Sequence, residues 1–92
     1  MRREDFLNEV ADIVTKDREQ QYGSAEDNFK NIADMWSIIK GVKFEPYEVA
    51  LFMIALKLVR EANKHKEDNW IDICGYSVCG SELCDDVKVV KK

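Results

Sequence analysis

Two cations and two carboxylates in the second half of the chain have the types and spacing of a site for an anion and a divalent ion. Lys57 and Arg60 are three residues apart and Asp68 and Asp72 are four apart, so each pair shares one face of a helix. The connection between the pairs is short, which favours antiparallel packing of the two helices. We therefore expect both pairs at the same end of a helical hairpin, forming either a ligand site or a structural group of salt bridges.

The cations have two interpretations. Arg60 could bind a phosphate through two parallel hydrogen bonds, with Lys57 acting as a point charge. Cations are also ordinary near a helix C-terminus, where these two could pair with Glu61, Glu67 or Asp68. The sequence leaves both interpretations open.

The carboxylates are candidate ligands for Mg²⁺, which prefers oxygen ligands and keeps several water molecules. Asp68 also has the type and position of a helix N-cap. Asp72 lies one turn further in, where capping does not explain a carboxylate, on the face that leads to Tyr76, a further candidate ligand-binding residue. Two carboxylates alone make an incomplete metal site.

Aromatic and amide side chains elsewhere suggest a nucleotide base. Tyr22, at a turn between helices, could stack on a base whose edge Asn28 reads; the alternative is a hydrophobic lid beside a solvated amide. Trp36 and Trp70 are more typical of a core than of a stacking platform. His65 lies in a polar run and is expected to be solvated.

Size and charge restrict the class of protein. A chain of 92 residues is expected to form one domain, 1–92, and the net charge of −4 argues against a non-specific nucleic-acid binder. No run approaches the roughly 18 apolar residues of a membrane span. Three cysteines spaced five apart around a helix fit neither a disulfide scaffold nor a single zinc site, which favours reduced thiols in a cytoplasm.

The hydrophobic periods predict an all-α bundle of about four helices. The first runs from Arg2 or Glu4 to about Gln20, with an apolar stripe that includes Val10. The second begins near Ser24 and ends at Gly41. Its predicted core stripe consists of Phe29, Ile32, Trp36 and Ile39.

The third helix begins at Pro46 and is apolar on all sides over 49–56, so we expect a homo-oligomer that buries part of this segment. The fourth runs from Asp68 to about Val87, and the tail 88–92 is expected to fray. Gly75 and Gly80 are poor helix formers, and their positions within it predict close approach of another helix or a ligand.

Several motifs resemble a small helical domain family of unknown function found in phages and prophages. They are QYGSAEDNF at 21–29, Ile32 to Trp36, EVA at 48–50, KLVR at 57–60 and DNWIDICGY at 68–76, within a match of about 16–82. That family is similar to the MazG-like all-α nucleoside triphosphate pyrophosphohydrolases, in which E-x-x-E and E-x-x-D motifs hold Mg²⁺. Here Lys57-x-x-Arg60 stands in place of the first motif and Asp68-x-x-x-Asp72 in place of the second. The resemblance therefore implies a metal position of the superfamily at Asp72 alone.

The resemblance implies a MazG-like bundle that handles nucleotides, either hydrolysing a nucleoside triphosphate or binding a nucleotide through the Lys57, Arg60 and Asp72 cluster. The alternative is a non-enzymatic phage accessory protein that binds a host protein or sequesters a small phosphorylated ligand in the host cytoplasm. The replaced carboxylates favour the accessory protein, and the cluster favours nucleotide handling.

Overall fold

The computed structural model describes residues 2–17 and 25–85, and these form helices without any strand. The elements are α1 (Arg3–Asp12), the π-helical turn η1 (Ile13–Asp17), α3 (Ala25–Lys40), α4 (Pro46–Asn63) and α5 (Glu67–Asp85). The predicted all-α bundle of about four helices is therefore confirmed. Over the described part of the chain, no helix combines the length and apolar character needed to span a membrane.

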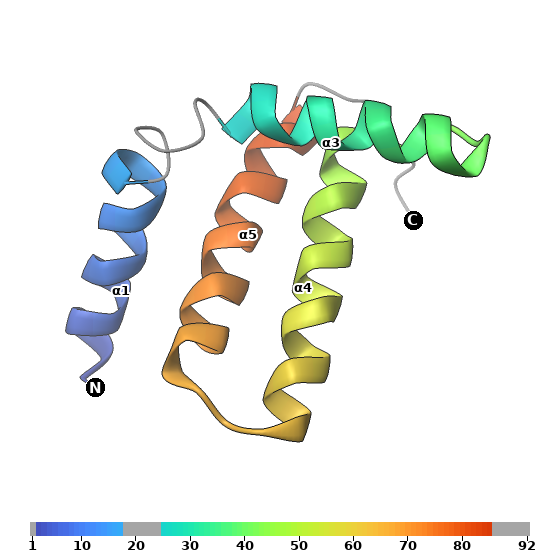
Figure 1. Ribbon diagram of the computed structural model, residues 1–92. Helices are drawn as coiled ribbons and strands as arrows, with labels where there is room; N and C mark the ends of the chain where they lie inside the picture. The colour runs from blue at the N-terminus through green and yellow to red at the C-terminus, as the bar shows by residue number, and fades with distance from the viewer. Residues whose placement is uncertain (1, 18–24, 86–92) are drawn as a thin grey trace.

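The helices α4 and α5 form an antiparallel hairpin around which the other helices pack (Figure 1). α1 and η1 lie against α5 on the side away from α4, so α5 is the middle helix of three. α3 crosses the N-terminal end of α4, and its own C-terminal end extends beyond that helix. The connection between α4 and α5 thus lies at the end of the molecule opposite α3.

Local signals set the ends of α3 and α4 where the sequence predicts them. Pro46 is in the first turn of α4, and Glu45 and Glu48 form a capping box in which the Glu45 backbone N–H donates to Glu48 Oε1 at 2.9 Å. α3 is followed by Gly41, whose φ of +72° is the left-handed conformation that favours glycine. Both predicted boundaries are confirmed.

The core lies where α3 packs on the hairpin, around Phe29 and Val49, which are fully buried. Phe29, Ile32 and Trp36 belong to it as predicted, but the prediction for Ile39 was wrong, because its residue surface is 69% exposed. The end of α3 that carries Ile39 extends past α4, where no other helix of the described part of the chain lies against it (Figure 1).

The two glycines of α5 mark close helix contacts, as predicted. A Cβ at Gly80 would lie 3.1 Å from the Ala50 Cβ on α4, and one at Gly75 would lie 3.5 Å from Val14 Cγ1. Glycine therefore lets α5 approach a helix on each side.

Two predicted boundaries need correction. α5 begins at Glu67, so Asp68 lies within its first turn, and the prediction that it is the N-cap was wrong. α1 changes to a π-helical turn after Asp12 and does not continue as one α-helix. The predicted end of the first helix at Gln20, the end of the fourth at Val87, and the tail 88–92 lie outside the described residues.

Candidate functional site

A groove opens at the loop end of the α4–α5 hairpin, with a volume of about 420 Å³. This volume is within the roughly 300–1,000 Å³ typical of small-molecule sites. The antiparallel hairpin brings the predicted cations and carboxylates together, since all four line it. The lining residues are Lys57, Arg60, Asn63, Lys64, Lys66, Asp68, Asn69 and Asp72.

One ion pair joins the two helices at the groove. Lys57 Nζ lies 2.7 Å from Asp72 Oδ2, and the two side chains are 14% and 35% exposed. Lys57 is thus largely enclosed, whereas Arg60 is exposed and has no ion pair among the described residues. The two cations therefore differ: Lys57 is engaged within the protein and Arg60 is available to a ligand.

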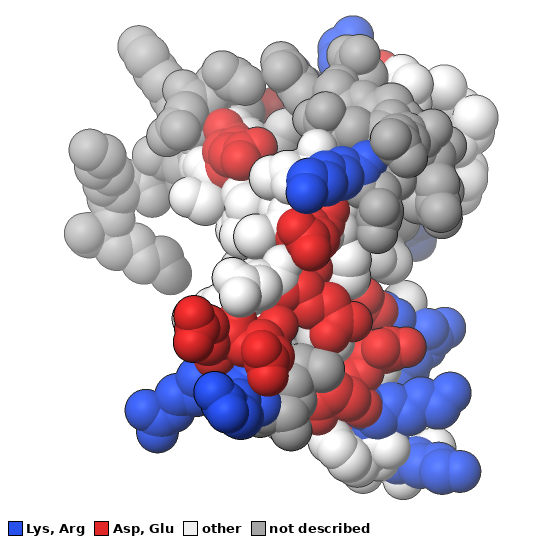
Figure 2. Space-filling view, turned by 90° about the vertical axis from the view of Figure 1, so that its left-hand side faces the viewer, with Lys and Arg blue, Asp and Glu red and all other residues white. Residues whose placement is uncertain are grey.

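The charge of the groove is opposite to that of the whole chain. Its lining carries four cations against two carboxylates, a formal charge of +2, while the chain carries −4. Figure 2 shows acidic side chains gathered over the middle and lower part of the face that α1 presents, with Lys and Arg side chains at its lower edges. Glu4 and Asp5, in the first turn of α1, contribute to this helix's acidity.

Glu61 organises the loop beside the groove, a role that the sequence analysis missed. Its Oε1 accepts hydrogen bonds from the Lys66 backbone N–H and from Asn69 Nδ2, each at 3.0 Å. Its Oε2 accepts one from Trp70 Nε1 at 2.7 Å and contacts His65 Nδ1. One carboxylate thus ties the end of α4 to the connection and to the first turn of α5.

The protonation of this network follows from its contacts. Burial raises the pKa of Glu61, but the hydrogen bonds from Asn69, His65, Lys66 and Trp70 together outweigh it and lower the pKa to about 2. The hydrogen bond to Glu61 and its charge raise the pKa of His65. His65 is mostly exposed but is bonded to Glu61, so it is not merely solvated as expected.

Trp70 and Asn69 reverse the expected pattern of burial. Trp70 was expected in the core, but it is 45% exposed and its indole N–H bonds Glu61. Asn69 is buried and bonds the same carboxylate. The signal that could have found Glu61 is the predicted hairpin itself, because a short connection places residue 61 opposite residues 69 and 70.

Metal binding has only partial support in the donor set. Among the described residues, no three or more Asp, Glu, His or Cys side chains are grouped to hold a metal ion. Asp68 and Asp72 line the groove together, but Asp72 is already paired with Lys57. Mg²⁺ at this place would need most of its ligands from water and from phosphate oxygens.

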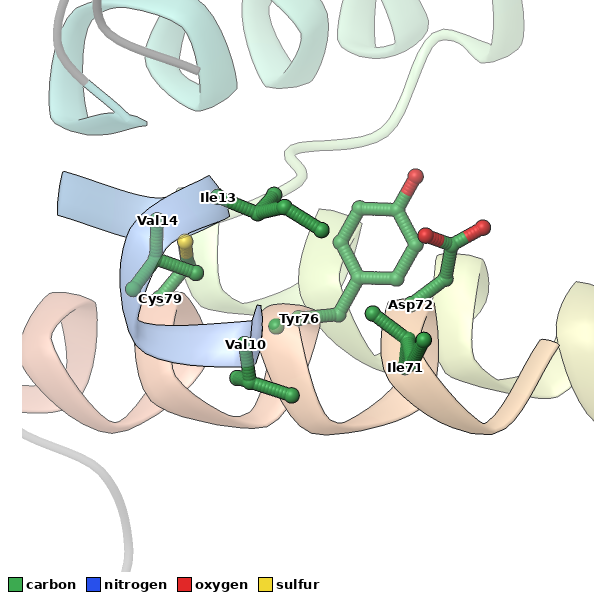
Figure 3. Close-up of a pocket in the computed structure, with 8 residues that line it drawn as sticks. Val10, Ile13, Val14, Ile71, Asp72, Tyr76 and Cys79 are labelled. Atoms are coloured by element: carbon green, nitrogen blue, oxygen red, sulfur yellow. The ribbon is translucent and has the colours of Figure 1, made fainter. Parts of the chain in front are cut away.

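Tyr76 lies one turn beyond Asp72, and both line a small cavity between α1, η1 and α5 (Figure 3). Figure 3 shows the two side chains projecting from the same side of α5. The Tyr76 ring is half-buried, with its centroid 6.2 Å from that of Phe29. The cavity has a volume of only about 40 Å³, room for water but well short of a nucleotide base.

Of the remaining predicted site residues, Asn28 does not join the groove. Asn28 is half-buried on α3, which packs at the opposite end of α4, and it is not among the groove-lining residues. Tyr22 lies outside the described residues. The groove therefore contains Lys57, Arg60, Asp68 and Asp72, with Tyr76 one turn away.

Comparison with known proteins finds a domain family of unknown function and relatives encoded by phages. The model of the family described as Domain of unknown function (DUF6378) matches residues 5–84. The Gene 55 protein of Mycobacterium phage L5 is 40% identical over 74 residues, which cover 78% of this chain and 47% of that protein. The Gene 55 protein of Mycobacterium phage D29 is 27% identical over 84 residues, covering 90% and 56%. The chain thus spans about half the length of these curated relatives, and no solved structure matches it.

Proposed function

Because the chain belongs to the DUF6378 family of domains of unknown function, we propose its function from the groove: it binds a nucleotide, or a similar phosphorylated small molecule, through the phosphate groups. The observation that carries this proposal is the concentration of four cations around one groove in an otherwise acidic chain. A phosphorylated ligand supplies the complementary charge, and the groove volume of about 420 Å³ suits a ligand of nucleotide size.

Each cation has a distinct part in this proposal. Arg60 grips the phosphate through two hydrogen bonds, because its exposed guanidinium has no ion pair among the described residues. Lys64 and Lys66, at the rim, add positive charge, and the Asn63 amide can donate to phosphate oxygens. Lys57 contributes electrostatically while it remains paired with Asp72.

Mg²⁺-dependent pyrophosphohydrolysis, which the MazG-like resemblance implies, is the more specific form of this proposal. Asp72 and Asp68 would hold the ion, and phosphate oxygens and water would complete its shell. Coordination by Asp72 would compete with its ion pair to Lys57, which lies at 2.7 Å. Binding therefore has stronger support than hydrolysis.

The second candidate is a non-enzymatic phage accessory protein that acts in the host cytoplasm, either on a host protein or by sequestering a phosphorylated ligand. Two observations favour it: the similarity to phage proteins, and the finding that residues 2–17 and 25–85 hold no group of three or more side chains able to ligate a metal. Product formation from a bound nucleoside triphosphate would separate hydrolysis from sequestration.

The test is a thermal-shift screen of nucleoside mono- and triphosphates and inorganic phosphate, each with and without Mg²⁺. A ligand at 100 times its Kd stabilises the folded state by about 2.7 kcal/mol. We expect Arg60→Ala to remove this stabilisation and Arg3→Ala, an exposed arginine on α1, to retain it. No stabilisation by any phosphate compound, or equal stabilisation of both variants, would reject phosphate binding at the groove.

A further inference from the structure

We propose that the outer face of α4 is the docking surface for a second copy of this chain, packed with its α4 antiparallel. This outer face is the set of apolar residues that point away from the hairpin: Leu51, Phe52, Ala55, Leu56, Leu58, Val59 and Ala62. At 100° per residue these seven fall within about 160° of the helix circumference. No charged residue interrupts them, so the surface is a continuous apolar strip.

The outer face is exposed because its own chain covers the other side of α4. Val49 and Ala50 are buried against α3 and α5, and Lys57 turns toward α5 to reach Asp72. On the opposite side Val59 is 68% exposed, and every other residue of the strip is exposed as well. In Figure 1 no described helix runs alongside α4 on that side, and only the end of α3 extends past it. Trp36 of α3 packs on Phe52, with ring centroids 5.6 Å apart, at the N-terminal end of the strip.

The exposed area of the strip is comparable with the smallest area that specific protein–protein interfaces bury. A large apolar residue has on the order of 150–200 Å² of surface, so the exposed fractions place the outer face of α4 on the order of 500 Å² per copy. Complete burial of both strips would remove on the order of 1,000 Å² from water, the lower limit for a specific interface. The apolar end of α3, which extends past α4 beside the strip, would increase this area.

The shape and charge of the chain favour a second copy in an antiparallel arrangement. Glu48 lies in the first turn of α4 and Arg60 in its last, so an antiparallel partner places acidic ends beside basic ends. The end of α3 projects at the N-terminal end of α4 (Figure 1). In a parallel pair the two projecting ends would meet, whereas in an antiparallel pair each would cover the C-terminal part of the other copy's strip.

A two-fold axis near Ala55 makes the strip self-complementary. The small side chain of Ala55 lets the two helices approach closely at the axis, and that of Ala62 does so at the end of the strip. Such a closed two-fold dimer is the commonest form of oligomer. This surface agrees with the sequence-based prediction that an oligomer buries part of 49–56, and it extends that prediction. Val49 and Ala50 are buried in their own chain, and the strip continues to Ala62.

The first test measures the mass of the whole chain in solution at high micromolar concentration. We expect twice the 10.7 kDa chain mass for the unchanged protein and the single-chain mass for Val59→Glu. Leu7→Glu is the matched control, because Leu7 is an apolar residue on α1 that is 63% exposed. It should remain dimeric, and circular dichroism should show equal helix content in all three. A monomeric unchanged protein, or a dimeric Val59→Glu, would overturn the proposal.

The second test fixes the orientation by cross-linking, in a chain whose exposed Cys84 is replaced by serine. In the antiparallel dimer Leu51 faces Val59 of the second copy, so a mixture of the Leu51→Cys and Val59→Cys variants should form a disulfide-linked dimer. The two Val59 residues of the dimer lie four positions on either side of the two-fold axis. Eight positions at 1.5 Å each separate them by about 12 Å along the helix axis. A disulfide spans only roughly 7 Å. Cross-linking of Val59→Cys with itself would overturn the antiparallel arrangement.

Discussion

Removing the Asp72 charge should destabilise the protein even in the absence of any ligand. Asp72→Asn leaves the ammonium of Lys57, whose side chain is only 14% exposed, without its partner at 2.7 Å. Breaking a fully buried pair costs about 3–5 kcal/mol, and an exposed pair contributes about 0–1 kcal/mol. Because Asp72 is 35% exposed and water screens the pair, we expect a loss of about 1–3 kcal/mol between these limits.

The assay is thermal and urea unfolding of the unchanged protein, Asp72→Asn, Arg60→Ala and the double variant Lys57→Met with Asp72→Asn. For a domain of this size a loss of 2 kcal/mol lowers Tm by about 8–16 °C. Arg60→Ala should change stability by less than about 0.5 kcal/mol, since Arg60 is exposed and unpaired among the described residues.

The double variant tests the cause of the loss. Methionine has nearly the length of lysine without its charge, so Lys57→Met removes the stranded ammonium and should recover most of the stability that Asp72→Asn loses. A loss below about 0.5 kcal/mol in Asp72→Asn, or no recovery in the double variant, would refute the reasoning that Lys57 is held by this pair.

Two further predictions concern the loop and the helix contacts. The pKa of Glu61 is lowered from 4.5 to about 2 in the folded state, so its contribution to stability is complete above pH 4.5 and is lost as the pH falls toward 2. Glu61→Gln should therefore flatten this part of the curve of stability against pH. Equal acid sensitivity of the variant and the unchanged protein would contradict this prediction. Gly75→Ala should raise the free energy of unfolding by about 0.5–1 kcal/mol through helix propensity, because its Cβ would meet Val14 at an ordinary 3.5 Å. Gly80→Ala should not show this increase in the free energy of unfolding, because its Cβ would lie 3.1 Å from the Ala50 Cβ. Urea unfolding that shows the same increase for both variants would refute this explanation.

The features that could be predicted from the sequence are those set by local signals. Pro46 and Gly41 fix helix ends through φ restriction and the left-handed conformation, and both are found where expected. The joining of cations and carboxylates at one end of a hairpin followed from helical spacing and a short connection. These inferences need no knowledge of how the helices cross.

The features that could not be predicted depend on which helix covers which face. Periodicity places Ile39 on the apolar stripe of α3, but only the crossing of α3 over α4 leaves it without a partner. Lys57 and Arg60 share one side of α4 in the sequence, yet they differ by about 60° around the axis. Lys57 therefore reaches Asp72 on α5 while Arg60 remains at the exposed edge of the groove.

The Glu61 network connects the stability of the loop to the proposed binding of phosphate. Glu61 is not among the groove-lining residues, but two of the groups that it holds, the Lys66 backbone N–H and the Asn69 amide, belong to residues that are. Fixing these residues before a ligand arrives reduces the conformational entropy that binding would otherwise cost. The charge of Glu61 is spread over hydrogen bonds on both of its oxygens, so it competes little with a phosphate for the cations at the rim. A negative residue beside a cationic groove is therefore compatible with anion binding, because it orders the groove while its own charge is satisfied within the loop.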